Sequence, residues 1–111
     1  MVLNFNMIFG EQIVKMLKLE NPQPEIILNA LLELNNKSSF LMYKTIIYCG
    51  ILGNDYITGI EESVTQEEVA SLILECNAEQ LNEVFTTLSK ELGFNLNVEI
   101  EDGNGNVEKK N

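Results

Sequence analysis

Between residues 40 and 52 the chain carries apolar side chains on nearly every side of a helix, rather than along a single stripe. A helix that is apolar all round must either lie in the middle of a core or be covered by a partner. Ser38 or Ser39 can cap its start, and typical stop signals follow at Gly50, Gly53 and Asn54. The rest of the fold therefore has to be arranged around this one segment.

Four further segments repeat apolar residues at the spacing of a helix with one buried face. The first ends near Leu19. Pro24 suits the first turn of the second helix, which Asn35 and Asn36 should end. The last helix ends at Gly93, because glycine favours the left-handed conformation that closes many helices.

The best-defined helix start in the sequence is the run Val64-Thr65-Gln66-Glu67-Glu68-Val69. It fits a capping box, in which Thr65 accepts from the Glu68 amide and Glu68 accepts from the Thr65 amide. Val64 and Val69 occupy the two positions of a hydrophobic staple. Asn77 is expected to cap the last helix in the same way.

The two ends of the chain alternate apolar and polar residues, as strands do. Residues 2–7 are compatible with a short strand and a second is expected at residues 96–100; whether the two pair is left open. An acidic loop is expected at residues 55–63, and residues 101–111 should be a flexible acidic tail. The sequence thus predicts a mainly α protein: a compact bundle of about five helices in a single helical domain, residues 1–100, followed by that tail.

The composition removes most catalytic and nucleic-acid-binding chemistry. The chain has no histidine and every basic residue is lysine, so the imidazole base and the bidentate guanidinium are both absent. The net charge is −10, and residues 54–111 carry all of it. Such a field repels phosphate, so neither nucleic acid nor an anionic membrane is an expected partner.

No catalytic, cofactor or metal site is expected. Cys49 and Cys76 have no histidine to activate them and are interpreted as buried free thiols of a reducing cytoplasm. The adjacent glutamate pairs are explained by solvation and helix capping. The run Asp102-Gly103-Asn104-Gly105-Asn106 resembles the opening of a calcium loop, but Val107 stands where that loop needs glycine. We therefore expect a non-enzymatic protein without cofactors.

The third helix is the best candidate for a partner surface, because five helices in a chain this short leave much surface relative to volume. The residues expected to bind are Tyr43, Ile47, Tyr48 and Ile51. A partner helix lying against such a surface is a recurrent mode of recognition. Burial of these four residues in the core is the alternative, and it would leave them no surface for a partner.

The order of these elements resembles that of the tail assembly chaperones of long-tailed (siphovirus-like) bacteriophages. The resemblance covers residues 7–94 and rests on the helix 41–54, the acidic loop after it, the Thr65-Gln66-Glu67-Glu68-Val69 start and the final helix 81–92. It implies a mostly helical fold that binds the tape measure protein, a long helical chain prone to aggregate, with the tail tube protein as a further partner. It also implies action in the host cell cytoplasm and absence from the mature virion.

Two other non-enzymatic functions fit the composition. An acidic DNA mimic would occupy the cleft of a nucleic-acid-binding protein with its carboxylates, and that binding would weaken steeply as salt rises. Binding of an apolar client would persist in salt. A structural adaptor within a larger assembly, and a homo-oligomer, are also left open by the sequence.

Overall fold

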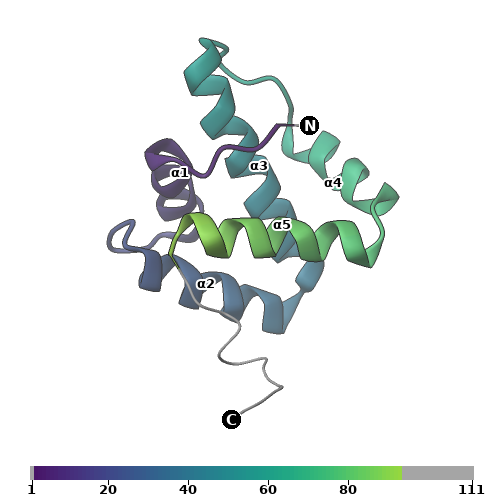
Figure 1. Cartoon of the computed structure of the whole chain (residues 1–111), viewed down its shortest axis with the longest axis horizontal. Helices are drawn as coiled ribbons and strands as arrows, with labels where there is room; N and C mark the ends of the chain where they lie inside the picture. Colours follow the sequence, from purple (N-terminus) through teal and green to yellow (C-terminus); the bar gives the residue numbers. More distant parts are fainter. Residues whose placement is uncertain (1, 94–111) are drawn as a thin grey trace.

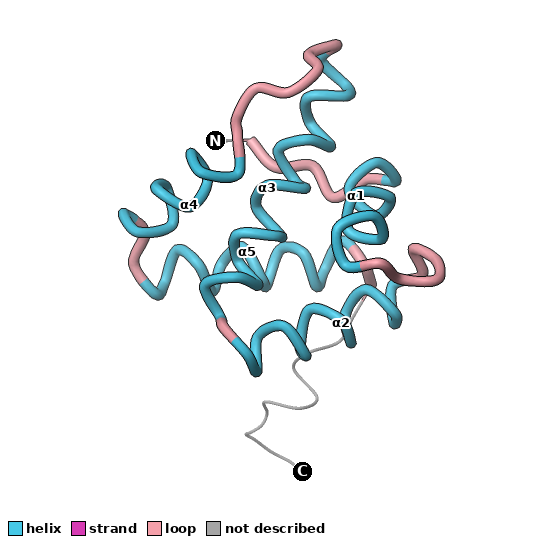
Figure 2. Tube along the Cα trace, turned by 180° about the vertical axis from the view of Figure 1, so that it is seen from behind, coloured by secondary structure: helices cyan, strands magenta, loops and turns pink. Residues whose placement is uncertain are grey.

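The structure, a computed structural model, describes residues 2–93 of the 111-residue chain. Five helices follow one another: α1 (Met7–Leu17), α2 (Pro24–Lys37), α3 (Ser39–Thr58), α4 (Gln66–Glu75) and α5 (Ala78–Glu91). Only helices and loops occur over these residues (Figure 2). The prediction of a mainly α fold with about five helices is confirmed. The strand expected at residues 96–100 and the tail at 101–111 lie outside the described residues.

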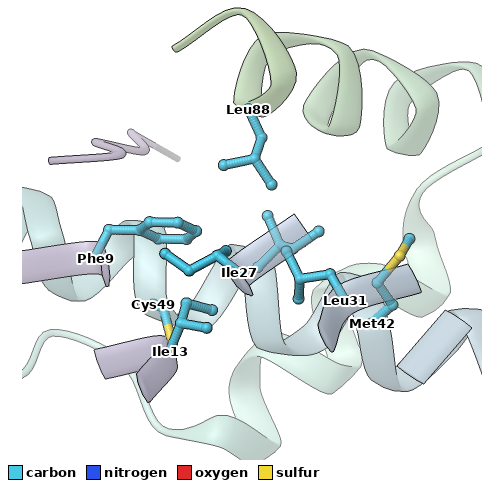
Figure 3. Close-up of a cluster of buried hydrophobic side chains, with 8 residues drawn as sticks. Phe9, Ile13, Ile27, Leu31, Met42, Cys49 and Leu88 are labelled. Atoms are coloured by element: carbon cyan, nitrogen blue, oxygen red, sulfur yellow. The ribbon is translucent and has the colours of Figure 1, made fainter. Parts of the chain in front are cut away.

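The longest helix, α3, runs through the middle of the molecule and contacts each of the other four (Figure 1). One of its faces, formed by Met42, Ile46 and Cys49, belongs to what we call the first core. The other members of this core come from α1, α2 and α5 (Figure 3): Phe9, Ile13, Ile27, Leu31 and Leu88. Helix α3 therefore holds three neighbouring helices with one face.

A separate face of α3 forms the second core, in which Ile47 and Ile51 pack against Val69 and Ile73 of α4. Burial along two faces explains why this helix is apolar nearly all round. Of the two alternatives that the sequence allowed for these apolar side chains, the core accounts for most of them.

The helix starts that the sequence predicted are confirmed in detail. Thr65 Oγ1 accepts from the Glu68 N–H at 3.2 Å, and Glu68 Oε1 accepts from the Thr65 N–H at 2.8 Å. Asn77 and Gln80 form the same reciprocal pair at the start of α5. Val69 is fully buried in the second core. These features are local, so three or four neighbouring residues are enough to specify them.

The prediction that Gly50, Gly53 and Asn54 end the central helix is wrong. Helix α3 continues to Thr58 and ends at Gly59, whose φ of +79° is the left-handed conformation expected of a closing glycine. The last turn of α3, residues 55–58, therefore occupies part of the stretch that was expected to be an acidic loop. The loop that joins α3 to α4 spans residues 59–65.

Gly50 and Gly53 lie inside α3 because residues 2–6 pack closely against the helix at these two positions. Residues 2–6 form no strand; they extend across α3 before α1 begins (Figure 1). The Asn4 N–H donates to the Gly50 carbonyl at 3.0 Å, and the Asn6 side-chain amide donates to the Gly53 carbonyl at 3.1 Å. A Cβ at Gly53 would lie 2.3 Å from the Asn4 carbonyl oxygen. Glycine is required here because another stretch of backbone passes too close for any side chain.

Candidate partner-binding groove

The four residues predicted to bind a partner do not share an accessible surface. Ile47 and Ile51 are only 0% and 6% exposed, since α4 already covers them in the second core. Tyr43 is half-buried and packs against both cores, and burial raises the pKa of its phenol. The expectation that Ile47 and Ile51 contact a partner is therefore corrected for this conformation. Of the four residues, Tyr48 lines an open groove on the surface.

Tyr48 lines an open groove of about 620 Å³ between α1 and α3, which we call the α1–α3 groove. Helix α3 contributes Tyr48, Leu52 and Tyr56, which share one face because residues four apart lie above one another on a helix. Helix α1 contributes Ile8 and Gln12 by the same spacing. Two helices thus supply a largely apolar wall on each side.

The 59–65 loop closes the third side of the groove with Gly59, Ile60, Glu61 and Glu62. Ile60 is 50% exposed and Tyr56, which also lines the groove, is 68% exposed. Large apolar side chains that gather at a hollow in this way are typical of a binding site for another chain. The groove therefore combines apolar walls with two carboxylates at one edge.

A buried carboxylate fixes the position of this loop. Asp55, in the last turn of α3, is 3% exposed and accepts hydrogen bonds from the Ser63 N–H at 2.7 Å and the Ser63 hydroxyl at 2.8 Å. The Ile60 N–H donates to the Asp55 carbonyl at 2.9 Å. A buried carboxylate is tolerated only when it is hydrogen-bonded, so these contacts hold the loop against α3. Asp55 is a structural residue of the groove rather than part of a free acidic loop.

Tyr48 and Glu62 are joined across one end of the groove, where the Tyr48 hydroxyl donates to Glu62 Oε2. Burial, this hydrogen bond and the nearby negative charge together raise the pKa of Tyr48 to about 12. Beyond the pair lies a second hollow of about 360 Å³, whose lining includes Lys44, Tyr48, Glu62 and Glu67. Because Lys44 is four residues before Tyr48, both hollows follow the same face of α3.

A further hollow, of about 410 Å³, opens on the side of the second core. Its lining joins Leu3 and Phe5 of the N-terminal segment to Val84 of α5, with Ile47 beneath. Cys76 also lines it; this thiol is half-buried, not fully buried as expected. Fewer large apolar side chains are exposed here than at the α1–α3 groove, so the latter is the stronger candidate for binding a partner.

The buried thiol of Cys49 belongs to the first core. It donates to the Met16 sulfur at 3.4 Å, and burial raises its pKa to about 12. A thiol that stays protonated in an apolar core is inert toward nucleophilic chemistry. Cys49 therefore acts as a small core residue.

No three histidine, cysteine, aspartate or glutamate side chains among residues 2–93 come together in a way that could hold a metal ion. The run that resembles a calcium loop lies outside that range. None of the five helices is both long and apolar enough to cross a membrane.

Sequence reasoning missed most of the groove. Leu52 and Tyr56 follow Tyr48 at intervals of four, a signal that the assumed helix end at Gly50 and Gly53 concealed. The sequence around Ile60 predicts an acidic loop and indicates no contact for this side chain. If the helix is continued to Thr58, the four-residue spacing alone places Tyr48, Leu52 and Tyr56 on one face.

No family model matches the chain, and no curated protein or solved structure matches it. The chemistry of the groove is therefore the basis for assigning a function.

Proposed function

We propose that the chain is a tail assembly chaperone of long-tailed bacteriophages, which binds an apolar helical segment of the tape measure protein in the α1–α3 groove. The observation that carries this proposal is the apolar lining of the groove, where the exposed Tyr56 and Ile60 are joined by the half-buried Ile8, Tyr48 and Leu52. Amphipathic helices bind such grooves by inserting side chains spaced three or four residues apart. The element order of the chain, set out above, supports the choice of client.

The charge of the chain suits it to keep a client dispersed. The net charge is −10, while the groove offers an apolar surface to the client. A complex whose apolar stripe is covered and whose outer face is anionic resists aggregation, because like-charged complexes repel one another. In this proposal the protein performs no catalysis, acts in the host cell cytoplasm before the tail tube protein polymerises around the client, and leaves before the virion is complete.

Co-expression with the tape measure protein of the same phage tests the proposal. Tyr56→Asp puts a charge into the groove at a side chain that is already 68% exposed, so the fold should survive. We expect the client to move from the soluble to the insoluble fraction. Ile57→Asp is the matched control: Ile57 is 59% exposed and adjacent in α3, but it is not among the residues that line the groove.

Circular dichroism should show equal helicity for both variants. A tape measure protein that stays equally soluble with Tyr56→Asp and with the unaltered chain would show that the α1–α3 groove is not the client site. Tyr48→Asp would be a less clean probe. Tyr48 packs against both cores and bonds to Glu62, so its loss disturbs the fold as well as the groove.

The salt dependence of binding distinguishes a chaperone from a DNA mimic. Binding through the apolar walls should persist at high ionic strength, where surface charges are screened beyond a few ångström. A complex that dissociates steeply with salt, and does not respond to Tyr56→Asp, would favour mimicry instead.

A further inference from the structure

We infer that the segment bound in the α1–α3 groove is an amphipathic helix whose apolar face is bordered by lysine or arginine. This inference rests on the proposed function and specifies which client segments the groove selects. It starts from the placement of charge around the apolar walls. Of the described residues that line the groove, Glu61 and Glu62 are charged and none is basic.

Both glutamates are exposed and belong to the loop that Asp55 holds in place. Glu62 Oε2 accepts from Tyr48, and its second carboxylate oxygen can accept a further bond. Glu67 adds a third carboxylate in the neighbouring hollow, where Lys44 is the one basic lining residue. The acidic edge therefore lies on the loop side of both hollows.

The dimensions suit two turns of a bound helix. Tyr48 and Tyr56 are eight residues apart, which is about 12 Å along α3 at the helical rise per residue. A helix lying beside them offers anchors at positions i, i+4 and i+7 over the same length. One flank of such a helix would face Glu61 and Glu62.

A cation on that flank gains charge-assisted hydrogen bonds with the two carboxylates. A carboxylate on that flank would be repelled by Glu61 and Glu62, so the groove selects against helices with an acidic border. A second copy of this chain is a poor occupant, because both copies carry a net charge of −10.

Two synthetic helical peptides test the inference with the full chain. They share one leucine stripe and differ only in having lysine or glutamate beside it, and fluorescence anisotropy measures their dissociation constants. We expect the lysine peptide to bind at least tenfold more tightly at low salt, equivalent to about 1.4 kcal/mol. Tyr56→Ala should weaken the binding of both peptides.

The double variant Glu61→Gln/Glu62→Gln should bring the two dissociation constants within about threefold. The control Glu75→Gln/Glu79→Gln removes the same charge at exposed positions at the end of α4 and the start of α5. It should leave the preference for lysine unchanged, which separates local recognition from attraction to the overall charge.

The outcomes distinguish the two proposals. Equal binding of both peptides that still depends on Tyr56 would overturn the charge inference and leave the groove as the client site. Binding that ignores Tyr56, or no binding of either peptide, would overturn both. A dimer in sedimentation that Tyr56→Asp dissociates would identify a second copy as the occupant and also contradict the inference.

Discussion

The side chain of Asn6 joins the start of α1 to the C-terminal half of α3 at Gly53. Its nitrogen donates to the Gly53 carbonyl at 3.1 Å, while its oxygen accepts from the Phe9 N–H at 3.0 Å and so caps α1. A Cβ at Gly53 would lie 2.7 Å from that oxygen. The contact thus couples a helix cap to a glycine 47 residues later.

Gly53→Ala should destabilise the protein by about 1–3 kcal/mol, the usual cost of overpacking. The new methyl group would meet the Asn4 carbonyl oxygen at 2.3 Å, and backbone cannot move aside as a side chain can. Alanine is otherwise favoured over glycine in a helix by about 0.5–1 kcal/mol. A loss of stability would therefore show that the clash outweighs the helix preference, and a gain would show that it does not. Chemical denaturation followed by circular dichroism measures it.

Gly50→Ala is the matched substitution one turn earlier in α3. Its Cβ would meet side-chain atoms of Phe5 at 3.0 Å and Leu3 at 3.2 Å, which can shift. We expect a stability change of less than about 1 kcal/mol, since the helical preference of alanine offsets the crowding. Equal losses for both variants would contradict the distinction between backbone and side-chain contacts.

Asp55→Ala should free the 59–65 loop and lower stability by about 2–3 kcal/mol, because hydrogen bonds to a buried charge are lost. Ser63→Ala removes only the hydroxyl donor and should cost about 1 kcal/mol. Amide hydrogen exchange at Ile60 and Ser63 should accelerate in Asp55→Ala. Unchanged exchange there would show that the carboxylate does not hold the loop.

The stability of the protein should fall as the pH rises from 9 to 12. The Cys49 thiol has a pKa of about 12 in the folded chain, against an ordinary value of 9.0, so the folded state keeps a proton that the unfolded state loses. Its contribution is complete below pH 9 and is lost as the pH rises through 12, at about 1.4 kcal/mol per pH unit in between.

Tyr48 acts in the same direction from pH 10 upward, since its pKa is also raised to about 12. Urea denaturation at several pH values measures the slope. Cys49→Ala should flatten it between pH 9 and 10, although this variant starts from a lower stability because of the cavity it leaves. An identical slope in the variant and the unaltered chain would assign the alkaline loss to other groups.

Thr65→Ala should cost about 1 kcal/mol, because α4 loses its capping hydroxyl. Thr86→Ala makes the same chemical change at an exposed position inside α5, where alanine is the better helix former, and should be neutral or slightly stabilising. If the cap is responsible, thermal denaturation should show a lower melting temperature for Thr65→Ala and an equal or higher one for Thr86→Ala.

The features that the sequence predicts well are those that neighbouring residues determine. The capping boxes at Thr65 and Asn77 and the start of α2 at Pro24 depend on contacts within four residues, and all three are present. The five helices follow from apolar spacing in the same way.

The errors concern residues whose role depends on a distant segment. Glycine is typical of a helix end, so Gly50 and Gly53 indicate one. In the structure both lie inside α3, because residues 2–6 pack directly against them. Ile47 and Ile51 could have faced a partner, and their burial follows from the position of α4. The error at Gly50 and Gly53 also hid the α1–α3 groove, because the helix had to continue to Thr58 before Leu52 and Tyr56 could be placed on one face with Tyr48.

The division of the interior into two cores predicts that α4 can detach independently of the other helices. Val69 and Ile73 are the buried apolar side chains of α4, and neither belongs to the core that unites α1, α2 and α5. Detachment of α4 would uncover part of the α3 face that carries Ile47 and Ile51 while the other helices stay packed. Native-state exchange should therefore resolve two protection levels, with the amides of α4 at the lower one.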